Sequence, residues 1–113
     1  MTTRKLEKAN WREELDRISK MLGPKQAEIE VAGLAIGDQI DAEWVSLLGI
    51  VYDPKSDVAE LGLEGLDHLI HKPREIYVED EAGALTNLEI VDADGVRQIV
   101  RLRDPLMLPP PRG

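Results

Sequence analysis

Two histidines, His68 and His71, are the only side chains of this chain whose ordinary pKa lies near neutral pH. They stand three residues apart, and Asp67 directly precedes the first. Imidazole and carboxylate groups are common zinc ligands, and on a helix this spacing would place both rings on one face. In a strand, however, residues i and i+3 point to opposite faces. Because Leu69-Ile70 followed by Lys72-Pro73 is typical of a short strand or turn, the sequence favours a structural role over a metal site.

The residue patterns that other common reaction types require are absent from the sequence. The chain has no cysteine, which excludes thiol redox chemistry and thiolate metal sites. No Ser/His/Asp spacing indicates a nucleophile, and no glycine-rich loop that could cradle a phosphate is present. The carboxylates of Asp38, Asp41 and Glu43 lack the glycine and the regular donor spacing of a calcium loop. We therefore predict no catalytic residue and no cofactor, and we favour a protein that is not an enzyme.

A basic ladder near the C-terminus is a candidate binding surface. It comprises Arg97, Arg101 and Arg103. These side chains would share one face of a strand and could receive an acidic partner or a phosphate-bearing ligand. Cross-strand pairing with Glu89, or with an acidic strand around Glu75 and Glu79, is the simpler alternative.

The last ten residues, 104–113, are rich in proline and predict an extended tail. Leu106 and Leu108 are its candidate contact residues. They could dock in the aromatic groove of a partner, or they could pack on their own domain. The sequence leaves both alternatives open.

Charge is distributed unevenly along the chain, whose net charge is −8. Residues 27–95 carry three basic against seventeen acidic side chains, while both ends are basic. An acidic middle repels phosphate backbones, so we expect no nucleic-acid partner. The N-terminus lacks the apolar stretch of a secretory signal, and no apolar run is long enough to span a membrane. These features predict a soluble cytoplasmic protein with no membrane partner.

At 113 residues the chain predicts a single domain, which begins with a helix over about 10–22. Its apolar stripe has the i, i+4, i+7, i+11 spacing of one helix face: Trp11, Leu15, Ile18 and Leu22. Asn10 is the expected N-cap, with Glu13 placed for a capping box. Gly23-Pro24 should end the helix.

Beyond the helix the period changes to two, which predicts strands from about residue 27 to 103. The clearest alternating or continuous apolar segments are 27–31, 40–44, 47–52, 59–63, 75–79 and 88–102. Together they predict an α+β domain that is mainly β. We expect the amphipathic helix to pack on an antiparallel sheet of about six or seven short strands, curled into a small barrel or roll.

The last hairpin has two possible registers, and the apolar pattern of the sequence favours one of them. A two-residue loop would mix apolar and charged residues on each face. A three-residue loop pairs Leu88 with Val100 and Ile90 with Gln98, which sorts the faces better. Gly95 would then take the left-handed position of a bulged turn.

Several short blocks of the chain, in the same order over nearly its full length, resemble one protein family. These blocks include Leu48-Gly49-Ile50-Val51-Tyr52-Asp53, Asp67-His68-Leu69-Ile70, Leu88-Glu89-Ile90-Val91-Asp92-Ala93-Asp94-Gly95 and Arg101-Leu102-Arg103-Asp104-Pro105. The family consists of short bacterial proteins known as domain of unknown function 5335. The resemblance implies a compact stand-alone bacterial domain, and it implies no activity, cofactor or catalytic residue.

Two functional hypotheses follow from these patterns. The first is a non-catalytic module that binds a protein or another ligand, with a second copy of the chain as one candidate partner. The alternative is a metal-dependent enzyme that uses His68 and His71 with nearby carboxylates.

Overall fold

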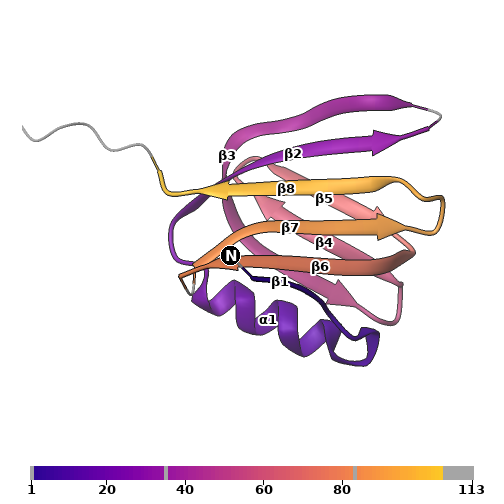
Figure 1. Ribbon diagram of the computed structural model, residues 1–113, viewed down its shortest axis with the longest axis horizontal. Coiled ribbons are helices and arrows are strands. Elements are labelled where there is room, and N and C mark those ends of the chain that lie inside the picture. The colour runs from indigo at the N-terminus through magenta and orange to yellow at the C-terminus, as the bar shows by residue number, and fades with distance from the viewer. Residues whose placement is uncertain (1, 35, 83, 106–113) are drawn as a thin grey trace, which may run out of the picture.

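The computed structural model describes residues 2–34, 36–82 and 84–105 and shows one helix on one antiparallel sheet (Figure 1). A short 3-10 turn, Lys8–Asn10, leads into the helix α1, Trp11–Met21. The strands are β1 Thr2–Lys5, β2 Lys25–Gly33, β3 Gly37–Asp53, β4 Val58–Leu63, β5 Leu66–His71, β6 Pro73–Glu81, β7 Ala84–Asp92 and β8 Arg97–Arg103. Their spatial order is β1-β6-β7-β8-β2-β3-β4-β5. The expected α+β class is confirmed.

The sheet has eight strands instead of the expected six or seven, and it does not close into a barrel. The two additional strands are β1 and β5, and both lie at its edges. Residues 2–5 show no apolar alternation, so β1 was not expected, and the segment around Leu69-Ile70 was expected as a short strand or turn. The sheet therefore forms an open roll.

Strand β3 causes the roll. Residues 40–44 and 47–52 were expected as separate strands, but β3 runs through all of them. Its first half pairs with β2 and its second half with β4. At Trp44 the backbone takes a positive φ of 50°, and the register with β2 shifts beside it. Such a bulge bends a strand, and in Figure 1 β3 leaves the side of β2 and curves toward β4.

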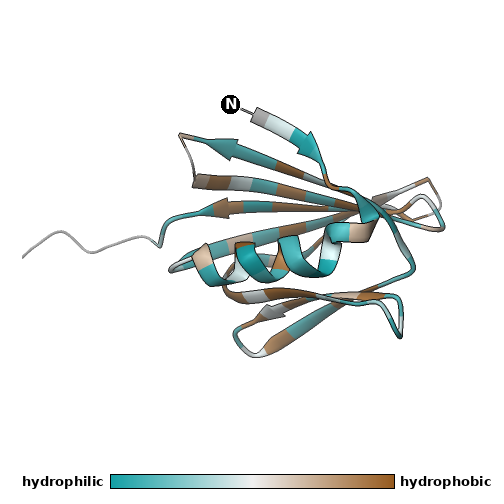
Figure 2. Ribbon diagram, turned by 90° about the horizontal axis from the view of Figure 1, so that it is seen from below, coloured by the Kyte–Doolittle hydropathy of each residue, from teal (hydrophilic) through white to brown (hydrophobic). Residues whose placement is uncertain are grey.

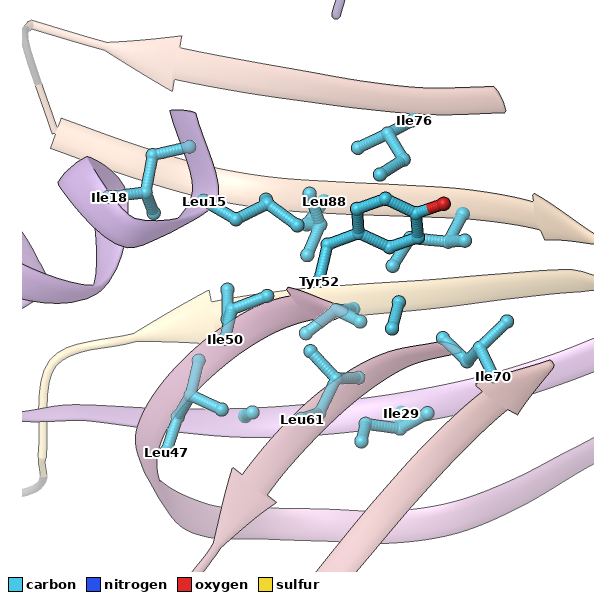
Figure 3. Packing of buried hydrophobic residues seen from close by; sticks show 14 of the residues in the cluster. Leu15, Ile18, Ile29, Leu47, Ile50, Tyr52, Leu61, Ile70, Ile76 and Leu88 are labelled. Atoms are coloured by element: carbon cyan, nitrogen blue, oxygen red, sulfur yellow. The ribbon is translucent and has the colours of Figure 1, made fainter. Parts of the chain in front are cut away.

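The core lies between the two halves of the rolled sheet. Figure 3 shows Ile50, Leu61 and Ile70, from β3, β4 and β5, close to Ile29 and Leu88 from the other half. All five side chains are buried. Burial of apolar surface on this scale is the main force that stabilises a domain of this size.

Helix α1 packs against β3, as Figure 2 shows from below, and its buried side chains join the core. Its apolar stripe is buried as expected at Trp11, Leu15 and Ile18. The Trp11 indole donates a hydrogen bond to the Leu6 carbonyl at 3.2 Å and meets the ring of Tyr52 edge to face at 5.2 Å. Packing thus fixes the helix more than capping does.

The C-terminal end of α1 was predicted correctly, whereas the capping interaction at its N-terminal end was not. Asn10 makes no side-chain capping hydrogen bond, so the expected capping box is wrong. The preceding 3-10 turn is the reason, because Asn10 has the φ and ψ of a turn residue instead of an extended cap. Gly23 does take the left-handed conformation, with φ of 62°.

The register of the β7–β8 hairpin confirms the prediction for a three-residue loop. Leu88 pairs with Val100 and Ile90 with Gln98. Gly95 has a φ of 79°. Asp92 braces the turn, because its carboxylate accepts hydrogen bonds from the backbone N–H groups of Asp94 and Val96.

Candidate functional site

The two histidines lie on opposite faces of β5. His68 pairs with Leu61 and points to the inner face, where its side chain is only 14% exposed. His71 pairs with Val58 and is exposed on the outer face. The strand alternation therefore keeps the two imidazoles from sharing a ligand.

His68 belongs to a polar cluster that joins three strands. Its Nε2 lies 2.7 Å from Oε1 of Gln98 on β8, and its Nδ1 lies 3.7 Å from Oδ2 of Asp41 on β3. Gln98 is 6% exposed and is the buried polar residue of the core. Asp41 stands where the β2–β3 register shifts, between residues paired with Ile29 and Glu30. The cluster ties β5 to the opposite half of the roll.

This cluster does not supply a metal centre. Asp67, the carboxylate considered in the sequence analysis, is exposed and lies across from Gly62, whereas the carboxylate near His68 is Asp41. In residues 2–34, 36–82 and 84–105, no three His, Cys, Asp or Glu side chains gather closely enough to hold a metal ion. The approach of Asp41 and Gln98 to His68 was not predicted from the sequence, because it depends on how the sheet rolls.

Two arginines of the ladder, Arg97 and Arg101, form ion pairs with carboxylates on neighbouring strands. Nη1 of Arg97 lies 2.6 Å from Glu89, the partner that the sequence suggested. Nη1 of Arg101 lies 3.2 Å from Glu28 and 3.0 Å from Glu30, both on β2. These acidic partners could not be read from the sequence, because β2 and β8 are far apart in the chain.

The third arginine has a different environment. The guanidinium of Arg103 lies 4.0 Å from the ring centroid of Trp44, and its Nε donates to Oε1 of Gln26 at 3.1 Å. Stacking of this kind stabilises the bend of β3 beside Trp44. Leu106 and Leu108, the other candidate contact residues, lie outside the described part of the chain.

Tyr77 and Glu75 extend this polar outer face. The Tyr77 hydroxyl donates a hydrogen bond to Glu75, which lowers the pKa of that carboxyl and raises the pKa of the phenol. The hydrogen bond from Arg97 to Glu89 likewise raises the pKa of the Arg97 guanidinium. Because Arg97 and Arg101 already have carboxylate partners, these two arginines do not form an open anion site.

Exposed apolar side chains occur elsewhere, on β3 and on β5. The exposed fractions are 69% for Leu48, 56% for Val51, 45% for Leu66 and 49% for Leu69. Val51 and Leu69 both pair with Glu60 on β4, so they share one row of the outer face. Exposed clusters of this kind commonly mark interaction surfaces.

The two edge strands of the sheet differ in protection. Strand β1 has four residues, and Arg4 and Lys5 place positive charge on it. Strand β5 has six residues without lysine, proline or a bulge, and it exposes Leu66 and Leu69. Charge and shortness normally guard an edge against pairing with another chain. Asp67 is the acidic residue of β5, and within the described residues β5 is the longer and the less guarded of the two edges.

Two contacts show which backbone groups of β5 bond to β4 and which face the open edge. The N–H of Lys72 donates to the carbonyl of Asp57 across the end of the β4–β5 ladder. Both backbone groups of Ile50 bond to Ser19, so they point away from β4. Antiparallel alternation then directs the backbone groups of His68 and Ile70 toward β4. The N–H and C=O groups of the alternate residues, Asp67, Leu69 and His71, face the open edge.

The fold and site define a class: an open-rolled α+β domain with an exposed edge strand and no cluster of three potential metal ligands among the residues described. A family model for a family of unknown function (DUF5335) matches residues 2–111, and the chain belongs to that family. An uncharacterized protein of Aquifex aeolicus (strain VF5) is 44% identical over 110 residues, which cover 96% of this chain and 99% of the relative. No solved structure matches the chain.

No helix in the described residues is long and apolar enough to cross a membrane.

Proposed function

We propose that the protein is a non-catalytic protein-interaction module that binds an extended segment by adding it as a strand to β5. The observation that carries this proposal is the edge itself: a six-residue strand with outward backbone groups and exposed leucines. In strand addition the main chain supplies affinity and alternate side chains supply selectivity. Asp67, Leu69 and His71 would be those selecting side chains.

The neighbouring surface supports this mode of binding. Leu69 and Val51 provide apolar area next to the edge, on either side of Glu60. Apolar contacts beside a main-chain ladder increase its strength, because backbone hydrogen bonds alone contribute little net free energy in water.

We place the partner among proteins and the module in the bacterial cytoplasm. The net charge of −8 opposes nucleic acids and anionic membranes, and two of the three ladder arginines, Arg97 and Arg101, are paired with carboxylates. A chain without cysteine suits a reducing compartment. The metal-enzyme alternative has no support in the geometry, because His68 is held by Gln98 and Asp41 and His71 faces the other way.

Site-specific photo-crosslinking in cells that produce the full chain tests this function. A photoreactive residue at position 67 should give discrete protein adducts, whereas one at Thr3 on β1 should give few. A further Leu69→Pro substitution removes an outward N–H that β4 does not use, so it should abolish the adducts at position 67. Equal adducts from both edges, or adducts that survive Leu69→Pro, would contradict the proposal.

A further inference from the structure

We infer that the strand added to β5 is β5 of a second copy, paired antiparallel about a two-fold axis that passes through Leu69. This inference rests on the proposed function and names its partner. Three features of β5 carry it: the direction of its backbone groups, the order of its outer side chains and the proline that follows it.

The backbone groups allow a symmetric pair at Leu69. A residue that lies opposite itself in a hydrogen-bonded pair must direct both its N–H and its C=O toward the partner. Lys72 bonds to Asp57 across the β4–β5 ladder, so alternation leaves the groups of Leu69 on the open edge. Its side chain is 49% exposed and accessible to a second copy.

The outer side chains are self-complementary in this register. With Leu69 opposite itself, Asp67 of each copy lies opposite His71 of the other, because both are two residues from the axis. All three side chains share the outer face by strand alternation. The pairing therefore places an apolar contact on the axis and an Asp–His contact on each side, in which an imidazole N–H of His71 can donate a hydrogen bond to the Asp67 carboxylate.

The two other registers that centre on an outward residue of β5 are worse for physical reasons. A two-fold axis at Asp67 would place two carboxylates directly opposite each other, which destabilises a strand pair. An axis at His71 would set Leu69 opposite Pro73, which has no N–H to donate. Leu69 is the outward residue of β5 whose self-pairing avoids both penalties.

The apolar row of the outer face would continue across the axis. Val51 and Leu69 flank Glu60 in one row that ends at the free edge. In the pair, the Leu69 side chains of the two copies would meet at the end of this row. The apolar surface exposed in the single chain would thereby become partly covered.

Cysteine cross-linking locates the axis, because the natural chain contains no cysteine. The Cα atoms of a hydrogen-bonded antiparallel pair lie about 5.5 Å apart, which a disulfide can span. We expect Leu69→Cys to oxidise readily to a covalent dimer. Val51→Cys is the matched control, because Val51 is similarly exposed on the same face but two strands from the axis. Equal or greater dimer formation by Val51→Cys would overturn the register.

Charge exchange tests the flanking contacts in the otherwise natural chain by analytical ultracentrifugation. Asp67→Lys should weaken dimerisation roughly tenfold, because it turns two attractive contacts into neutral or repulsive ones. Adding His71→Glu should restore the affinity. The change in net charge alone would favour dimerisation, because each copy carries −8 and a lysine reduces the repulsion between copies. Asp38→Lys, exposed on the β2–β3 hairpin, makes the same charge change and should not weaken the dimer.

A natural chain that stays monomeric at high concentration would overturn this inference, as would an Asp67→Lys variant that dimerises undiminished. If position 67 then still cross-linked to a different protein, the proposed interaction function would stand without the symmetric dimer.

Discussion

The hydroxyl of Ser19 bonds both backbone groups of Ile50, accepting from its N–H at 2.8 Å and donating to its carbonyl at 2.6 Å. The β2–β3 ladder reaches Leu47 but does not extend to Ile50. Ser19 therefore occupies the place where a neighbouring strand would bond to β3. The helix covers one potential edge of the sheet by this contact, while β5 has no such cover among the described residues.

Replacing Ser19 by alanine should therefore destabilise the protein. The change leaves part-buried backbone groups of Ile50 without their partner, and we expect a loss of about 1–3 kcal/mol in the free energy of unfolding. Urea denaturation followed by tryptophan fluorescence measures it. Ser56→Ala is the control, because the Ser56 hydroxyl bonds Asp53 in an exposed turn. A loss no larger than that of the control would show that the Ser19 contacts do not matter.

Tyr52 should make stability depend on alkaline pH. Burial, followed by its hydrogen bond to Asp57, raises the pKa of the Tyr52 phenol to about 12. A raised pKa means that the stabilisation is fully present below the ordinary value of 10.0 and is lost as pH rises through about 12. We expect the free energy of unfolding to fall across this window.

Urea unfolding at several pH values tests the role of Tyr52. Tyr52→Phe should be less stable near neutral pH by about 0.5–1.5 kcal/mol, because it lacks the hydrogen bond to Asp57. The free energy of unfolding of Tyr52→Phe should also fall less steeply above pH 10.0 than that of the natural chain. Tyr77→Phe is the comparison, since the Tyr77 phenol bonds Glu75 and should leave the Tyr52 contribution in place. An unchanged pH profile in Tyr52→Phe would contradict this assignment.

His68 and Gln98 should be energetically coupled. His68→Leu or Gln98→Leu alone leaves a polar group without its partner inside the roll, whereas the double replacement removes both. A double-mutant cycle in urea should give a coupling energy of about 0.5–3 kcal/mol. Strictly additive losses would mean that the 2.7 Å contact contributes little.

The sequence predicted best where the relevant contacts are local. The helix stripe and the β7–β8 register depend on neighbouring residues, and Gly95 restricts the turn between Leu88 and Val100. The rolled sheet was harder, because the bend at Trp44 requires a positive φ that tryptophan rarely adopts. Nothing in the apolar pattern of 40–52 distinguishes one bent strand from two.

In the candidate site, too, the features that depend on local sequence were predicted and those that depend on distant strands were not. Strand alternation alone predicted that His68 and His71 face apart, as they do. The approach of Asp41 and Gln98 to His68 could not be predicted, since it joins strands that are not neighbours in the sheet. A local signal for β5 was present: the Glu64-Gly65 turn, where Gly65 has a φ of 78°.

Amide hydrogen exchange, measured by NMR on dilute and concentrated samples of the natural chain, tests the central claim that β5 pairs with β5 of a second copy. The amides of His68 and Ile70 bond toward β4 and should be protected in both samples. Those of Asp67, Leu69 and His71 should exchange fast when dilute and become protected when concentrated, as a second copy pairs with the edge. Fast exchange at Leu69 in both samples, or protection that spreads equally to β1, would contradict the claim.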